Sequence, residues 1–526
     1  MTSRSKSLFN TADPDMRKLL EKEAVLTDLG NASGLAYWDQ DVNMPEGGED
    51  ARVKLISTLD TIQHDLQTRR YLDRLITRLE GKVDNGDFSE YDRALLRELR
   101  TDYDLASKLP RRFVTEQSKV NSKAQQTWKR AKMANDGKGD FSLFASDLAA
   151  VFDLKRREAD YLGFQGHPYN ALLDQYEQGL TVEQLDTIFP VLVDATKTIL
   201  DRVEGAEVDR SFLSLKYPRG VQWSFARRLS RSLGFDFTRG RLDRAVHPFT
   251  IKFDPTDVRI TNRADPNYLP AGVFGVIHET GHALYEQGVD RGLSGTRLAT
   301  GTSMGIHESQ SRFWENYVGR SNEFWEYWFP MLQRKFPSQL GSVNVDQFVK
   351  AINAVRPSPI RIEADEITYN IHVVIRYEIE RDLLSGKIQT KDVPMIWNEK
   401  MRSYLGIDPQ TDSQGALQDV HWSSGLVGYF PSYSLGNIYA AQFYNSLRNQ
   451  HPDIDRSISK GEYGFIRQWL RENIHRHGSV YRPGDLSTNV TGEQLNPQYF
   501  VDYAMNKFGR LYGIDLKTSQ LNPLHA

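Results

Sequence analysis

The sequence contains no cysteine among its 526 residues. This absence excludes disulfide bonds, thiol catalysis and thiolate metal ligands, so any metal ion must be held by nitrogen and oxygen atoms. The chain also lacks a hydrophobic run of 18 residues, and no apolar segment follows the polar start at residues 1–7. These absences predict neither a membrane-spanning helix nor a secretory signal, and we expect a cytoplasmic protein.

The chain also lacks a large excess of positive or negative charge. The chain has 66 lysines and arginines against 69 aspartates and glutamates, and its formal net charge is −3. This balance gives no reason to expect nucleic acid or an anionic membrane as a partner. With 39% hydrophobic and 26% charged residues, the composition is that of a globular protein with a large core. Because we find no repeat, low-complexity tract or clear linker, residues 1–526 are predicted to form one domain.

Most of the chain has the hydrophobic spacing of α-helices. Asp13 is a suitable N-cap and Pro14 a suitable first residue for a helix that Gly30 would end. Ser89 is a suitable N-cap for a helix that runs to Pro110. Further helices with start or stop signals at their ends are predicted over residues 110–135 and 219–233.

The most informative motif is the pentapeptide His278–His282, which reads HETGH. On a helix, positions i and i+4 lie on one face about 6 Å apart along the axis, so His278 and His282 can share one metal ion. Glu279 would then stand beside the metal, where it can accept a proton from a water molecule as general base. The alternative is a half-buried helix whose two histidines are satisfied by neighbouring groups.

A catalytic zinc site requires a third protein ligand and leaves its fourth position for water. Glu286 lies one turn further along the same helix, which favours a role in supporting a ligand. Glu308 follows a glycine-rich stretch and opens another segment with helical spacing. From spacing alone, a metal ligand and a solvated carboxylate in the first turn of a helix are equal alternatives for Glu308.

One region departs from the helical pattern. From His247 to Thr261, apolar and polar residues alternate on both sides of a turn that contains Pro255. This pattern predicts a small β element shortly before the metal-binding helix. A structural hairpin and a strand edge that pairs with a peptide backbone are equal alternatives for it.

Six short motifs follow one another along the chain. They are His247-Pro248-Phe249, Asp257-x-Arg259-x-Thr261, His278-Glu279-x-x-His282, His307-Glu308-Ser309-Gln310, Ile360-Arg361-x-x-Ala364-Asp365 and Gly415-x-x-Gln418-Asp419-x-His421-Trp422. Their identity and order resemble the carboxypeptidase Taq family of HExxH zinc metallocarboxypeptidases. With Trp38-Asp39-Gln40 included, the similarity runs from about residue 35 to the end of the chain.

The resemblance implies a mainly α, large helical metallopeptidase fold with a deep active-site groove and a small β element beside the metal helix. Residues 1–526 would form a single catalytic domain, in which the helical part at about 1–235 covers the groove and about 240–440 carries the metal and substrate site. The resemblance also implies zinc, for which cobalt can often substitute, Glu308 as the third ligand, and a homodimer. The expected substrates are peptides with a free carboxyl terminus, cleaved one residue at a time with broad specificity.

Two further roles complete the predicted catalytic site. Glu279 acts as the general base, and negative charge on the carbonyl oxygen needs hydrogen-bond donors besides the metal. His421 and either Tyr429 or Tyr433 are the candidates for that stabilisation. Aromatic packing is the better expectation for the other tyrosine.

An enzyme that cuts only at chain ends must recognise the terminal carboxylate, for which a planar guanidinium is well suited. The resemblance assigns this role to Arg361, and Arg259 is the second candidate. A structural ion pair, with Asp365 or Asp257 respectively, is the alternative for each arginine. Two further substrate-binding candidates come from the motifs, His247 and Gln418.

A helical zinc oligoendopeptidase or dipeptidyl carboxypeptidase is the alternative function, because such enzymes share the HExxH chemistry. A non-catalytic binding protein is a third possibility. The intact Glu279 argues against that third function, since binding alone does not require a general base.

Overall fold

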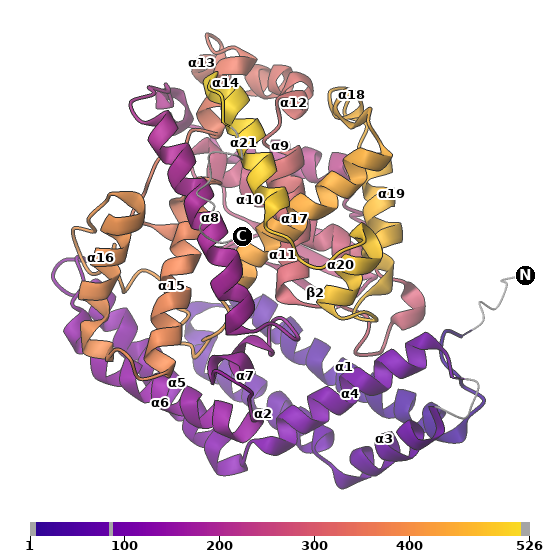
Figure 1. Cartoon of the computed structure of the whole chain (residues 1–526). Helices are drawn as coiled ribbons and strands as arrows, with labels where there is room; N and C mark the ends of the chain where they lie inside the picture. Colours follow the sequence, from indigo (N-terminus) through magenta and orange to yellow (C-terminus); the bar gives the residue numbers. More distant parts are fainter. Residues whose placement is uncertain (1–6, 84–87, 517–526) are drawn as a thin grey trace, which may run out of the picture. The chain divides into compact units, whose positions relative to one another are not determined.

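A computed structural model of the chain describes residues 7–83 and 88–516. Helices make up most of these residues, and one small three-stranded sheet accompanies them (Figure 1). This arrangement confirms the predicted mainly α fold with a small β element. Within the described part of the chain, no helix is long and apolar enough to cross a membrane.

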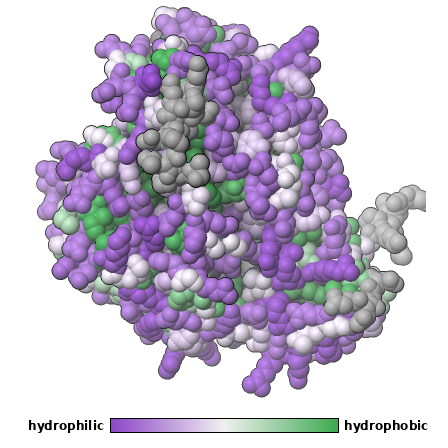
Figure 2. Space-filling view, viewed as in Figure 1, coloured by the Kyte–Doolittle hydropathy of each residue, from purple (hydrophilic) through white to green (hydrophobic). Residues whose placement is uncertain are grey.

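The chain forms two compact units. Unit 1 contains the described residues of Met1–Ser107, Asp209–Val349 and Phe443–Gly492, and unit 2 those of Lys108–Val208, Lys350–Gln442 and Glu493–Ala526. On the face drawn in Figure 2, hydrophilic residues predominate and hydrophobic ones form small separate groups. The single catalytic domain and the deep groove stay predictions.

Unit 1 begins with the long helix α1 (Pro14–Val42). Asp13 caps it by accepting hydrogen bonds from the backbone N–H groups of Asp15 and Met16 at 2.7 and 3.1 Å. The predicted stop at Gly30 is wrong, because the helix continues for another 12 residues to Val42. Glycine costs a helix only about 1 kcal/mol relative to alanine, and burial of apolar residues beyond Gly30 outweighs that cost.

Helix α2 (Glu49–Gln67) packs along α1 after the 3₁₀ turn η1 (Glu46–Gly48), and α3 (Arg70–Val83) and α4 (Glu90–Lys108) follow. The prediction that Ser89 caps α4 is confirmed. The N–H of Asp92 donates to Ser89 Oγ at 3.1 Å, and the N–H of Ser89 donates to the Asp92 carboxylate at 2.8 Å. Helices α1, α3 and α4 share a core of buried side chains that includes Met16, Leu19, Leu75, Ile76, Leu79 and Leu95.

Helix α9 (Arg219–Leu233) has its predicted bounds and ends at Gly234, whose φ of 112° is left-handed. The sheet follows, with β1 (Gly240–Arg244), β2 (Thr250–Asp254) and β3 (Asp257–Asn262) in the order β1-β3-β2. Strands β2 and β3 form an antiparallel hairpin, which confirms the small β element predicted within His247–Thr261, whereas the parallel strand β1 was not predicted. In β1 only Leu242 is buried, so the strand carries too little apolar alternation to be recognised.

Helix α10 (Leu269–Gly288) is buried along most of its length and contacts β2, β3, α9 and α11. Helix α11 (Met304–Arg312), capped by Ser303, continues into the π-helical turn η5 (Phe313–Val318). The two helices approach closely at Gly281, where a Cβ atom would lie 2.5 Å from the carbonyl oxygen of Gln310. Only glycine fits at this contact, which brings α11 beside the two histidines of α10.

Several shorter elements complete unit 1, and three helices contribute residues to both units. The additional elements of unit 1 are η3 (Ser211–Ser214), η4 (Arg291–Leu293), α12 (Asn322–Lys335), α13 (Pro337–Leu340), α18 (Ile454–Ile458), α19 (Gly464–Asn473), η8 (His475–His477) and α20 (Pro483–Thr491). The shared helices are α14 (Val345–Ile352), α17 (Pro431–Gln450) and α4, of which only the last residue, Lys108, belongs to unit 2.

Unit 2 is built around α15 (Tyr369–Leu384), whose residues are mostly buried and which contacts α6, α8 and α16. Helix α5 (Arg111–Met133) confirms the helix predicted after Pro110. It also holds the segment between α16 and α17, because Trp128 and Lys132 donate to the carbonyl oxygens of Leu417 and Gln418 at 3.0 and 2.8 Å. The remaining elements are η2 (Phe141–Leu143), α6 (Ala145–Leu162), α7 (Tyr169–Leu173), α8 (Val182–Val203), η6 (Arg361–Glu363), η7 (Thr390–Asp392), α16 (Val393–Leu405) and α21 (Gln498–Tyr512).

Candidate active site

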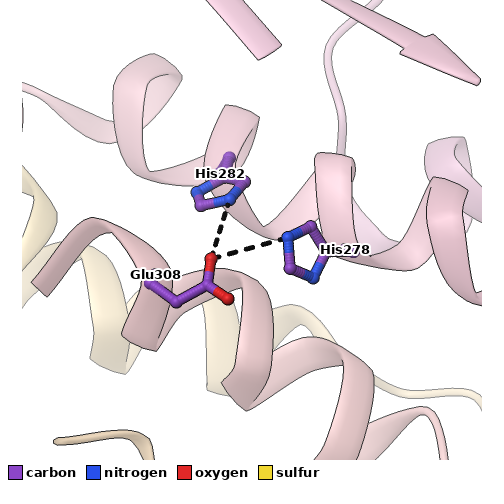
Figure 3. Close-up of side chains that lie close together, drawn as sticks. All are labelled: His278, His282 and Glu308. Atoms are coloured by element: carbon purple, nitrogen blue, oxygen red, sulfur yellow. Dashed lines mark ion pairs between the residues drawn. The ribbon is translucent and has the colours of Figure 1, made fainter. Parts of the chain in front are cut away.

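Two histidines of α10 and one glutamate of α11 converge in unit 1 (Figure 3). His278 Nε2 and His282 Nε2 lie 3.5 and 3.4 Å from Glu308 Oε2, and the three ligand atoms are all within 4.8 Å of one another. Two ligand atoms about 2.1 Å from a tetrahedral ion are about 3.4 Å apart, so the geometry fits one such ion. Two imidazoles and one carboxylate are also a donor set typical of catalytic zinc.

Glu308 is only 6% exposed and lies in the second turn of α11, which excludes a solvated carboxylate in the first turn. Arg312 donates to Glu308 Oε1 at 2.7 Å, and Ser311 donates to Oε2 at 3.0 Å. Burial opposes ionisation, but Arg312 and His278 outweigh it and hold the pKa of Glu308 well below its ordinary value. The carboxylate is therefore in its anionic, metal-binding form.

A second carboxylate supports His278 from behind. Glu315 Oε2 lies 2.8 Å from His278 Nδ1, and Arg312 and Arg320 also pair with Glu315, at 3.2 and 3.1 Å. This contact fixes the ring so that Nε2 faces Glu308. Sequence reasoning missed Glu315, although its position seven residues after Glu308 places both on one face of a helical segment.

His282 is supported by a longer chain of contacts. Its Nδ1 lies 2.6 Å from His307 Nδ1, and His307 Nε2 lies 2.8 Å from Glu286 Oε1. Glu286 thus reaches a candidate ligand through His307, in agreement with the supporting role expected from its position. Burial lowers the pKa of His282 to about 4, which keeps its imidazole neutral and able to bind a metal.

Glu279 lies beside the candidate ligands and is 5% exposed. Its Oε2 accepts a hydrogen bond from Thr250 Oγ1 at 2.6 Å, and the same hydroxyl lies 3.1 Å from the backbone oxygen of Glu279. Burial raises the pKa of Glu279, which makes the carboxylate a stronger base. Because Thr250 belongs to β2, the small sheet lies beside the metal helix as predicted.

The two other candidates in unit 1 belong to the sheet and its loop. Arg259 donates two hydrogen bonds to Asp257 at 2.8 and 2.9 Å, and its guanidinium carbon lies 4.5 Å from the ring centre of Trp38. This is the structural pair named as the alternative for Arg259. His247 is exposed in the loop between β1 and β2, three residues before Thr250.

In unit 2, Arg361 is 6% exposed and pairs with Asp419, whose Oδ1 lies 2.8 Å from Nη2. Nη1 of Arg361 donates to the hydroxyl of Tyr369 at 2.8 Å. The expectation that Asp365 would form the structural ion pair with Arg361 is wrong, because Asp419 forms it. The Asp365 carboxylate accepts instead from the backbone N–H groups of Arg356, Ile367 and Thr368.

Asp419 holds a second arginine that sequence reasoning missed. Arg376 is fully buried in α15, and its Nη2 lies 2.6 Å from Asp419 Oδ2. Gln418 joins this network, since its Oε1 accepts from Arg376 at 2.8 Å and from the Arg361 N–H at 2.9 Å. The signal for Arg376 was a single charge directly after the mostly apolar run Ile371–Ile375.

His421 and the two candidate tyrosines form an aromatic group. His421 Nε2 lies 3.2 Å from the Tyr433 hydroxyl, and the ring of Tyr429 packs edge-on against Tyr433 with centroids 5.3 Å apart. Burial, with Arg361 and Arg376 nearby, lowers the pKa of His421 to about 4. A neutral imidazole can donate a hydrogen bond, but the catalytic roles of His421, Tyr429 and Tyr433 stay predictions.

Glu380, another residue that sequence reasoning missed, anchors the segment that carries these groups. Its carboxylate accepts from Trp422 Nε1 at 2.7 Å, from the N–H of Gly428 at 2.9 Å and from the Tyr169 hydroxyl. Burial raises the pKa of Glu380 to about 7. A single buried side chain therefore fixes both ends of the stretch between His421 and Tyr429.

Comparisons with known proteins identify the family of this chain. The family model described as carboxypeptidase Taq (M32) metallopeptidase matches residues 18–508. The chain is 41% identical to carboxypeptidase 1 of Bacillus subtilis, over 96% of this chain and 99% of that one. It is 38% identical to thermostable carboxypeptidase 1 of Thermus thermophilus, over 96% of this chain and 100% of that one.

Solved structures give the same result. The M32 carboxypeptidase from Deinococcus radiodurans R1 matches with a TM-score of 0.92 and 35% identity, over 95% of this chain and 100% of that one. Trypanosoma cruzi metallocarboxypeptidase 1 matches with a TM-score of 0.88 and 37% identity, over 94% of this chain and 99% of that one. The family implies a divalent metal, which the three converging side chains fit. This chain therefore belongs to the carboxypeptidase Taq (M32) family of metallopeptidases, which hydrolyse peptides.

Proposed function

We propose that this protein is a zinc-dependent metallocarboxypeptidase that removes single residues from the free carboxyl ends of peptides with broad specificity. The observation that carries the proposal is the convergence of His278, His282 and Glu308 next to the buried Glu279. We further propose, from the family resemblance, that it acts as a cytoplasmic homodimer. Zinc is the proposed metal, since a His-His-Glu set suits it, and cobalt is a possible substitute.

In the proposed mechanism, His278, His282 and Glu308 hold the ion. When bound, zinc acts as a Lewis acid that makes a water molecule acidic near neutral pH and polarises the scissile carbonyl. Glu279 accepts the proton from the attacking water and then passes it to the leaving amine. Thr250 orients the carboxylate of Glu279 through its 2.6 Å hydrogen bond. His421 and one of Tyr429 or Tyr433 are proposed to donate to the developing oxyanion.

Arg361 is the proposed receptor for the substrate's terminal carboxylate. A guanidinium has five N–H donors, and the contacts with Asp419 and Tyr369 leave some of them for a ligand. Asp419 holds this side chain in one orientation, and Gln418 holds the backbone of Arg361 by accepting from its N–H; both contacts reduce the entropy lost on binding. Gln418 thus supports the site through Arg361, while direct substrate contacts by Gln418, Arg259 and His247 stay predictions.

Paired peptides test the proposed function. The zinc-loaded protein is incubated with a free-acid peptide and with its carboxyl-terminal amide, and the products are identified by mass. Single residues are expected to leave the free acid only, because the amide lacks the charge that Arg361 would bind. Equal cleavage of both peptides would support an oligoendopeptidase, and release of dipeptides would support a dipeptidyl carboxypeptidase. Glu279→Gln protein serves as the matched control for contaminating peptidases.

A separate prediction concerns Glu315, the carboxylate behind His278. Glu315→Gln is expected to weaken zinc affinity by about 10- to 100-fold, the usual effect of losing a partner of a metal-bound histidine. A competition titration with a chelator measures the change. Glu326→Gln is the matched control, since Glu326 lies exposed on α12. Equal zinc affinity in Glu315→Gln and wild-type protein would show that Glu315 does not tune the site.

A further inference from the structure

Unit 1 contains an open pocket with charged and apolar lining residues that the proposed mechanism does not use. Its volume is about 640 Å³, and residues from α1, the start of α9, the end of β1 and the segment between β3 and α10 line it. Three of the lining residues are Arg219, Arg244 and Arg263, and we call it the arginine pocket. A pocket of this volume can hold the side chain of a peptide residue.

The charges of the arginine pocket favour an anion. None of its three arginines forms an ion pair within the part of the chain that the structure describes. Other arginines of the same region are paired, as Arg241 is with Asp243 at 2.6 Å. All three arginines are exposed to solvent, so water screens their mutual repulsion, but their unpaired N–H donors are accessible to a carboxylate.

Two aspartates also line the pocket, but they do not neutralise it. Asp41 and Asp265 supply two negative charges and the three arginines supply three positive charges, so the lining carries one positive charge in excess. The carboxylate of Asp265 accepts from the backbone N–H of Asn267 at 2.8 Å, so it is engaged within its own turn. Arg219 is the first residue of α9, whose positive dipole end adds to the attraction for a negative group.

The apolar wall of the pocket favours a peptide over a small inorganic anion. Trp223 lines the pocket, and the guanidinium of Arg244 lies 5.3 Å from the centre of its ring. Stacking on the ring restricts the guanidinium and offers a flat surface to the methylene groups of an acidic side chain. Inorganic phosphate would use the charges but not this surface.

The pocket is also within reach of the candidate active site. Val246 lines the pocket and precedes Thr250 by four residues, and Thr250 contacts the general base Glu279. Four residues span at most about 14 Å, so a short extended stretch of substrate would cover that distance. Both sites belong to unit 1, so their separation is fixed within one compact unit.

We propose that the arginine pocket binds an acidic side chain of the peptide substrate, several residues away from the scissile bond. This inference rests on the proposed function and adds a substrate class to it, namely peptides with a glutamate or aspartate upstream of the residue that is removed. The pocket would raise the apparent affinity for such peptides and leave the chemical step unchanged.

A peptide series tests the proposal. In otherwise neutral peptides, glutamate replaces glutamine at one position at a time, and kcat/KM is measured for each pair. At one or two positions the glutamate peptide is expected to be cleaved about five-fold more efficiently, the effect of a few partly exposed charge pairs. The preference should appear in KM and weaken as salt is added, because salt screens exposed charges.

Two double variants separate the pocket from general charge effects. Arg244→Gln with Arg263→Gln should abolish the glutamate preference and leave cleavage of the glutamine peptides unchanged. Arg241→Gln with Arg402→Gln removes the same total charge outside the pocket and should keep the preference. A preference that survives in the pocket variant, or that is absent from wild-type protein, would overturn the proposal.

The same measurements distinguish the other outcomes. If no peptide of the series is cleaved, the proposed function itself fails. If glutamine peptides are cleaved but glutamate gives no advantage, only the arginine pocket proposal fails. Inorganic phosphate that raises the melting temperature of wild-type protein but not of the pocket variant, with no glutamate preference, would identify a site for free anions and would also overturn it.

Discussion

Glu279→Gln is expected to lower kcat by about 1000-fold, within the range that a positioned general acid–base contributes. Glutamine has the size of glutamate and can still accept the hydrogen bond from Thr250, which donates to Glu279 at 2.6 Å. It cannot take a proton from water at neutral pH. The variant should therefore keep its fold and its zinc, which elemental analysis of the purified protein measures alongside kcat.

The controls for this variant separate the base from the metal site. Glu326→Gln makes the same chemical change on the exposed side of α12 and should leave kcat unchanged. Full activity of zinc-loaded Glu279→Gln would refute the general-base role. Loss of zinc together with activity would instead place Glu279 among the groups that hold the metal.

The sequence predicts those parts of the site that depend on local geometry. His278 and His282 lie one helical turn apart, and any helix that contains them brings their rings to one face. Glu308 is different, because its distance to the histidines depends on how closely α10 and α11 pack. That approach is set by Gly281 and the backbone at Gln310, a contact that no local spacing encodes.

The fold shows the same distinction between local and distant effects. The caps at Asp13 and Ser89 are local and were predicted correctly. The expected stop at Gly30 failed because residues beyond it, such as Ala36 and Trp38, are buried and extend the helix. Strand β1 is stabilised by its parallel pairing with β3, and the pattern of its own residues does not predict a strand.

The partner of Arg361 is a further case in which proximity in sequence misleads. Asp365 is four residues away and was the expected structural partner, whereas Asp419 is 58 residues away and makes the ion pair. Asp365 is unavailable because it caps the following turn through the N–H groups of Ile367 and Thr368. Aspartate favours such local backbone contacts, so its charge is often used within its own turn.

Glu308→Gln is expected to weaken zinc affinity more than 100-fold, beyond the 10- to 100-fold typical of a supporting residue such as Glu315. Glu308 is the one anion among the three proposed ligands, and its pKa is held well below the ordinary value by Arg312 and His278 in spite of burial. Glutamine removes that charge but can still accept from Arg312, which lies 2.7 Å from Glu308 Oε1. The fold should therefore survive, as circular dichroism would show, while chelator competition reports the loss of zinc.

Comparing the loss of zinc affinity in Glu308→Gln and Glu315→Gln decides which carboxylate is the direct ligand. A direct ligand and a residue that orients a ligand both lower affinity, but the direct ligand must lower it more, because its loss removes a bond to the metal and not only a constraint on a ring. If Glu315→Gln cost more affinity than Glu308→Gln, the third ligand would not be Glu308. The two carboxylates contact the same imidazole through different nitrogen atoms, Nε2 for Glu308 and Nδ1 for Glu315. Such a reversal would therefore mean that the ion binds on the Nδ1 side of His278, away from His282.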